Sequence, residues 1–188
     1  MNADLTNPFD NVLMAARRAL EDVVMPSVDV GNPLANEQLR LVVRFLELVR
    51  QRAAHVAARQ RAELVLALDL ASAVQPVAAA APAEVRDGLA TAIDEARRLC
   101  QSNRIDGLAW RQAADRLDAL VACTVRCAAR FDDAPRRAVQ HAVLVASKRT
   151  LDLRRAWYSP LGLDPEASSV PDLDAALDAA LCAPETQP

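Results

Sequence analysis

The chain has 188 residues, of which 52% are hydrophobic and 3% are aromatic. This length suits one substantial core and is short for two, so we expect one domain. The net charge of −3 provides no global field that would attract nucleic acid or an anionic membrane. Only 4 glycines are present, and alanine, leucine and arginine are frequent. We therefore predict an all-α fold, a single antiparallel bundle of about six main helices with a short C-terminal helix.

The hydropathy of the sequence predicts neither a secretory signal nor a membrane-spanning helix. Residues 1–10 are polar and include Pro8, unlike a secretory signal. The most apolar stretch, residues 62–83, is interrupted by Glu63, Asp69 and two prolines, so it does not span a membrane. The four cysteines fit a reducing compartment. We predict a cytoplasmic protein.

The first helix is predicted over Pro8 to Met25. Asn7 and Pro8 form a cap, Asp10 lies in the first turn, and Pro26 ends the helix. Helical spacing defines an apolar stripe that we expect to be buried: Phe9, Val12, Leu13, Ala16, Leu20, Val23 and Val24.

Asn32 and Pro33 repeat this cap and begin a second helix. No glycine or proline follows until Pro76, and a helical pattern of roughly 40 residues suggests a break, which we place near Ala57 to Arg61. Whether residues 33–74 form one helix or two stays open. The stripe to be buried is Leu39, Val42, Val43, Leu46, Val49, Ala53 and Ala57, and a second apolar face is Leu41, Phe45 and Leu48. This second face is either sandwiched within the bundle or meets a partner.

The remaining elements follow from prolines, caps and apolar spacing. We predict helices over Ala83 to Gln101, from beyond Gly107 to before Asp132, from beyond Pro135 to about Tyr158, and from about Asp172 to Leu181. Residues 1–160 are expected to form the bundle. Residues 161–188 are expected to form a loop, a short acidic helix and a frayed tail.

No catalytic signature accompanies these helices. Cys123 and Cys127 lie four residues apart on one helix but lack further ligands in a zinc spacing, so we interpret them as small hydrophobic residues. His55 and His141 have no catalytic partner in the sequence and are expected to be solvated. We predict no catalytic residue, no metal site and no cofactor. An enzyme that uses these cysteines, or the Asp132 and Asp133 pair, is the less favoured alternative.

Charge is uneven along the last third of the chain. Residues 136–155 carry six basic residues against one acid, whereas residues 156–188 carry six acids and no lysine or arginine. A basic helix and an acidic tail can fold together and neutralise each other. This interpretation is favoured over a phosphate-binding patch, and we predict no nucleic-acid binding.

Four segments carry a resemblance to a known family: residues 12–26 (VLMAARRALEDVVMP), 39–50 (LRLVVRFLELVR), 98–107 (RLCQSNRIDG) and 119–131. They resemble a small, all-helical bacterial family of unknown function, whose members are often encoded beside acyl-CoA dehydrogenases and aminoglycoside-phosphotransferase-like kinases. The chain departs from that family in its additional helix and acidic tail. The resemblance implies an accessory partner for a CoA-linked enzyme or a kinase, and it carries over no functional residue.

The doubly apolar helices and the missing catalytic motifs favour a non-enzymatic accessory or interaction protein. We expect it to dock a partner enzyme or to self-associate as a homo-oligomer. The alternative is a helical domain that binds a small apolar ligand, such as an acyl group or acyl-CoA, with Phe45, Trp110 and Trp157 as walls of the ligand-binding pocket.

Overall fold

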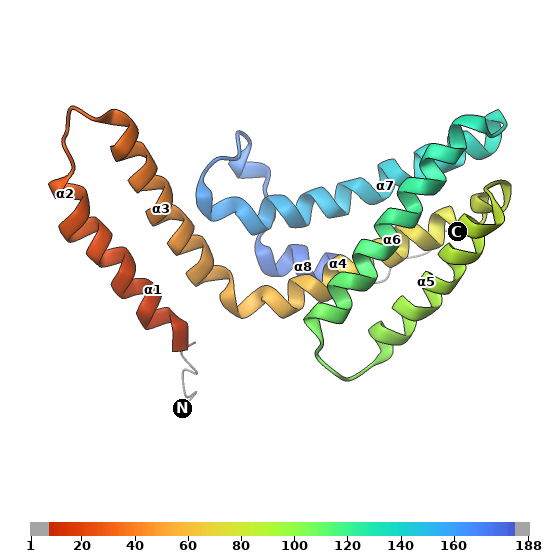
Figure 1. The fold of residues 1–188 in the computed structure, drawn as a ribbon, viewed down its shortest axis with the longest axis horizontal. Coiled ribbons are helices and arrows are strands. Elements are labelled where there is room, and N and C mark those ends of the chain that lie inside the picture. Colours follow the sequence, from red (N-terminus) through yellow and green to blue (C-terminus); the bar gives the residue numbers. More distant parts are fainter. Residues whose placement is uncertain (1–7, 183–188) are drawn as a thin grey trace. The chain divides into compact units, whose positions relative to one another are not determined.

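A computed structural model describes residues 8–182 of the chain (Figure 1). Every regular element within this range is helical, and none of these residues forms a strand. The prediction of an all-α fold is therefore confirmed. None of the described helices combines the length and the hydropathy that crossing a membrane requires.

Tertiary contacts divide the described residues into two compact units. Unit 1 consists of residues 8–56 and 157–170, and unit 2 consists of residues 57–156 and 171–182. Residues 157–170 belong to unit 1, whereas residues 171–182 pack within unit 2. Each unit is therefore built from two separate segments of the sequence.

Unit 1 begins with a helix close to the predicted one. α1 spans Pro8–Ala19 and continues through one π-helical turn, Leu20–Val24, into the short α2, Met25–Ser27. The helix does not stop at Pro26 as predicted: it continues through this proline to Ser27, and the Met25 amide still donates to the Leu20 carbonyl. The cap predicted at Asn7 lies outside the described residues.

α3, Pro33–Arg52, begins where its cap was predicted: the Oδ1 atom of Asn32 accepts a hydrogen bond from the Ala35 amide at 3.0 Å. A 3₁₀ turn, Ala53–His55, separates α3 from α4, Val56–Val74. Residues 33–74 therefore form two helices. The break lies just before the predicted segment, and it contains no glycine or proline to mark it.

The second part of unit 1 packs against α3. The Nε atom of Arg52 donates to the carbonyl of Trp157 at 3.0 Å, and its guanidinium lies 6.0 Å from the centroid of the indole ring. A 3₁₀ turn, Ser159–Leu161, then ends at Gly162, whose φ of 65° is the left-handed conformation that glycine adopts without steric cost. Residues 157–161 thereby cover one edge of α3.

Unit 2 is an alanine-rich helical assembly with a closed core. It contains α4 from residue 57 onward, α5 (Ala83–Gln101), α6 (Gly107–Cys127), α7 (Asp133–Tyr158, up to residue 156) and α8 (Leu173–Leu181). The predicted bounds of α5 are confirmed. The main core cluster includes Leu64, Ala71, Leu89, Ile93, Trp110, Leu117 and Val121. Small alanines among larger side chains let these helices approach closely.

α7 starts earlier than predicted but ends as predicted, at Tyr158. Pro135 does not delay its start, because it lies in the first turn, after Asp133, where no N–H is needed. One side of α7 faces inward, since Val139 and Leu153 are buried.

α8 is short and is held by side chains of other helices. Four of its nine residues are buried: Leu173, Ala176, Leu177 and Ala180. The guanidinium of Arg149 on α7 donates to the carbonyls of Ala179 (2.8 Å), Ala180 (3.2 Å) and Cys182 (2.9 Å) at the end of α8. The same guanidinium pairs with Asp69 of α4 at 2.8 Å. The basic helix thus contacts the acidic tail through the carbonyl end of α8.

Candidate interaction surface

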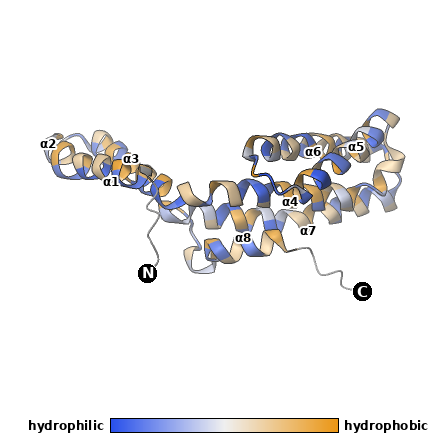
Figure 2. Cartoon of the chain, turned by 90° about the horizontal axis from the view of Figure 1, so that it is seen from below, coloured by the Kyte–Doolittle hydropathy of each residue, from blue (hydrophilic) through white to orange (hydrophobic). Residues whose placement is uncertain are grey.

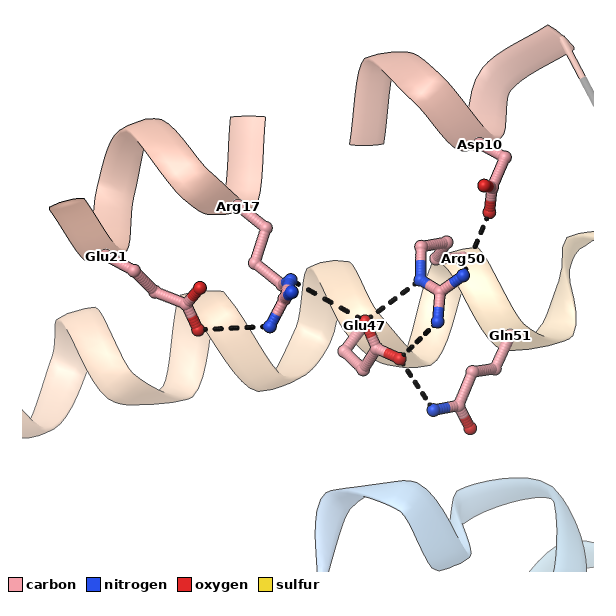
Figure 3. A network of polar contacts seen from close by, with 6 residues as sticks. All are labelled: Asp10, Arg17, Glu21, Glu47, Arg50 and Gln51. Atoms are coloured by element: carbon pink, nitrogen blue, oxygen red, sulfur yellow. Dashed lines mark hydrogen bonds and ion pairs between the residues drawn. The ribbon is translucent and has the colours of Figure 1, made fainter. Parts of the chain in front are cut away.

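A chain of ion pairs joins the two long helices of unit 1, α1 and α3, which pack side by side (Figures 1 and 3). Arg50 of α3 binds both carboxylate oxygens of Glu47, at 2.7 and 3.0 Å, and pairs with Asp10 of α1 at 3.1 Å. Arg17 of α1 lies 3.8 Å from Glu47 and 3.2 Å from Glu21. These contacts fix the antiparallel register of α1 against α3.

The network shifts the protonation of its central carboxylate. Hydrogen bonds from Arg50 lower the pKa of Glu47 to about 2, against the smaller opposing effect of burial, and Gln51 and the charge of Arg17 act in the same direction as Arg50. Hydrogen bonding to Glu47 and Asp10 raises the pKa of Arg50. Glu47 is therefore a carboxylate at neutral pH.

Unit 1 has almost no buried core. Among its described residues only Leu48 and Trp157 are classed as buried, each with 8% of its surface exposed. The apolar residues of α1 that were predicted to be buried divide into two sets. Leu13 and Leu20 are half-buried, whereas Phe9, Val12, Val23 and Val24 are exposed. The prediction of one buried stripe on α1 is wrong, because the stripe is wider than a single neighbouring helix can cover.

The exposed set forms a stripe of its own along α1 and the π-helical turn that follows it, with steps of three and four residues. Its large members are Phe9, Val12 and Val23, which are 66%, 64% and 65% exposed, and Ala16 and Ala19 lie between them. Such spacing is the seam pattern of helices that pack against other helices. This stripe is therefore an apolar seam that residues 8–182 leave uncovered.

α3 carries a matching stripe. Val42, Phe45 and Val49 follow each other by three and four residues and are 45%, 49% and 51% exposed. Burial was predicted for Val42 and Val49, and the structure corrects this. Figure 2 shows hydrophobic residues along both helices of this pair. α3 thus has one apolar side toward residues 157–161 and a second one toward solvent.

The two stripes lie on the same side of the α1–α3 pair. Asp10 and Arg17 mark the side of α1 that faces α3, and Glu47 and Arg50 mark the side of α3 that faces α1. At 3.6 residues per turn, the α-helical members of each stripe are turned by about 130° from that direction, in the same rotational sense. A two-fold axis perpendicular to the plane of the two helix axes exchanges the two antiparallel helices and leaves each side of that plane unchanged. Rotations of equal size and sense therefore place both stripes on the same side of this plane.

We call this side the apolar face and define it by its residues: Phe9, Val12, Ala16, Ala19, Val23, Val42, Phe45 and Val49. All eight are exposed and none is charged. The opposite side of the pair is polar, with Asn11, Arg18, Asp22, Arg40 and Arg44. One side of the α1–α3 pair is therefore suited to water and the other to an apolar partner surface.

The three residues predicted as walls of a ligand pocket are distributed over both units. Trp110 belongs to the core of unit 2, with 5% of its surface exposed, whereas Phe45 and Trp157 belong to unit 1. Within unit 1, Trp157 is stacked near Arg52 and Phe45 lies on the apolar face. Binding of an acyl-type molecule by these three residues stays a prediction.

A shallow cavity of about 240 Å³ lies between α5 and α6 in unit 2. Its lining includes Val85, Cys123, Arg126 and Cys127, and the Nη2 atom of Arg126 lies 2.9 Å from the Cys123 sulfur. Cys123 and Cys127 are half-buried thiols that form no disulfide. Within residues 8–182, no group of three or more metal-binding side chains gathers at one place.

The other polar residues that the sequence singled out are placed separately. Asp133 begins α7 and pairs with Arg136 one turn later. His55 is half-buried in the turn between α3 and α4, so its predicted solvation is only partial, and His141 is exposed.

Comparisons with protein families, with curated proteins and with solved structures found no match to this chain.

Proposed function

We propose that this chain is a non-enzymatic interaction protein and that it associates with protein through the apolar face of unit 1. The observation that carries the proposal is the exposure of six large hydrophobic side chains on one side of α1 and α3, in a unit with almost no core of its own. Single exposed hydrophobic residues are ordinary, but a contiguous patch of this kind is typical of a contact surface.

The chemistry of the face supports a protein partner. Its spacing of three and four residues matches the packing of one helix against another. Its phenylalanines, Phe9 and Phe45, are of the residue class that is enriched at the centres of protein interfaces. The resemblance to the bacterial family adds a candidate partner, a CoA-linked enzyme or a kinase.

A photo-crosslinking amino acid at position 45 tests the proposal in living cells. We expect one discrete crosslinked protein product from this position, since it lies at the centre of the face. The matched control is position 44, because Arg44 is exposed on the polar side of the same helix. Equal products from both positions, or none from position 45, would contradict the proposal.

A further inference from the structure

We infer that a second copy of this chain covers the apolar face, so that two α1–α3 pairs form a four-helix bundle across a two-fold axis. The inference rests on the proposed function, because it names the partner of the same surface. Three properties of the face support it: its area, its shape and its lack of charge.

The area is sufficient for a stable dimer. The six large side chains of the face are 45% to 66% exposed, and together with the two alanines they present on the order of 600 Å² of apolar surface per copy. Two copies would bury about 1,200 Å², the lower end of the range for specific protein interfaces. Neighbouring side-chain stems would add to this value. The face is therefore large enough for a dimer without a contribution from unit 2.

The face is complementary to itself in shape. The ion pairs Asp10–Arg50 and Arg17–Glu47 set the register of α1 against α3, and this register places Ala16 about level with Phe45. Each copy therefore carries the phenyl ring of Phe45 beside a shallow recess formed by Ala16 and Ala19. In a two-fold contact, residue i of one copy meets residue j of the other, and j meets i. Phe45 of each copy can thus fill the alanine recess of its partner, as large and small residues alternate in a packed core.

The absence of charge on the face also favours a second copy. A face that carried charges of one sign would repel a second copy, whereas an uncharged face meets itself without repulsion. The described part of unit 1 also has almost no buried core, so a cover that is present whenever the chain is folded would stabilise it. A second copy satisfies this condition because it is always made in equal amount.

Sedimentation or light scattering of the purified full-length chain over a wide concentration range tests the inference. We expect a dimer that dissociates on dilution. Ala16→Glu and Phe45→Glu should each weaken it by roughly 30-fold or more, because each would place a charge at the centre of the interface. Arg44→Glu, on the polar side, is the matched control and should leave the dimer unchanged. Circular dichroism checks that each variant keeps its helices.

A measurement without mutation complements these variants. Amide hydrogen exchange of residues 9–23 should slow as the concentration of the wild-type chain rises, while exchange in α5 and α6 stays constant. A chain that is monomeric at every concentration, or a dimer that both glutamate variants leave intact, would overturn the inference. A crosslink from position 45 to a different protein, with a monomeric purified chain, would overturn the second copy and leave the proposed function standing.

Discussion

The guanidinium of Arg149 is the polar link that holds α8 in unit 2, and its removal gives a sharp prediction. It donates to three carbonyls at the end of α8 and pairs with Asp69 of α4. A helix of nine residues is too short to be stable alone. The order of α8 therefore depends on its buried side chains and on this arginine. We predict that Arg149→Met, which keeps an apolar stem, releases the end of α8.

The expected magnitude follows from these contacts. A hydrogen bond to a charged group contributes about 1.5–3 kcal/mol when it is shielded from water. The Arg149 side chain is 28% exposed, so water replaces part of the loss, and we expect about 2–3 kcal/mol for the whole group. That free energy corresponds to a roughly 30- to 150-fold increase in the opening constant of α8.

Hydrogen exchange with mass spectrometry measures this opening for residues 173–182. The matched control is Lys148→Met, which removes a cation from the adjacent, exposed position on α7 and should leave exchange in α8 unchanged. Equal exchange of α8 in Arg149→Met and in the wild-type chain would refute the reasoning, since the four hydrogen bonds would then contribute nothing to its docking.

Three further predictions concern the ion network, the core and a cap. In the folded chain the pKa of Glu47 is about 2, below its ordinary value of 4.5. The ionised Glu47 therefore stabilises the fold fully above about pH 4.5, and this stabilisation is lost as the pH falls toward 2. Glu47→Gln should remove that part of the acid sensitivity of α1, as measured by hydrogen exchange. Leu117 is fully buried, so Leu117→Ala should lower the free energy of unfolding in denaturant by about 2–5 kcal/mol, and a loss below about 1 kcal/mol would contradict its place in the core. Asp106 accepts from the Ala109 amide at 3.0 Å, so Asp106→Ala should cost about 1 kcal/mol in the same assay while Asp106→Asn should cost little.

Helix ends with a chemical marker could be predicted from the sequence. Asn32 with Pro33 marks the start of α3, and Asp172 marks the start of α8. The break at Ala53–His55 could not be predicted at its position, because these residues are ordinary helix formers. There the change from one packing unit to the next coincides with the break in the helix, and packing between distant segments leaves no local sequence signal.

The candidate surface was visible in the sequence only as hydrophobic periodicity. The spacing identified Phe9, Val12, Val42 and Val49 as residues that belong in contact with apolar surface. Periodicity does not show which surface covers these residues. We predicted burial within the chain, whereas the structure leaves them exposed. The ion pairs that orient α1 against α3 decide which apolar residues turn outward, and they join residues about 30 to 40 positions apart.

The contrast between the two units gives the reason to expect association. Unit 2 closes its own core around Leu64, Leu89 and Leu117, so hydrophobic burial stabilises it without a partner. In unit 1 the inner side of α1 carries Asp10 and Arg17 beside the half-buried Leu13, and partly exposed ion pairs contribute little net stability. The ion pairs thus set the register and direction of α1, while its most exposed large hydrophobic side chains, Phe9 and Val12, lie on the apolar face. The stability of α1 should therefore depend on whatever covers that face, and, if the inferred dimer forms, α1 should lose order first when that dimer dissociates.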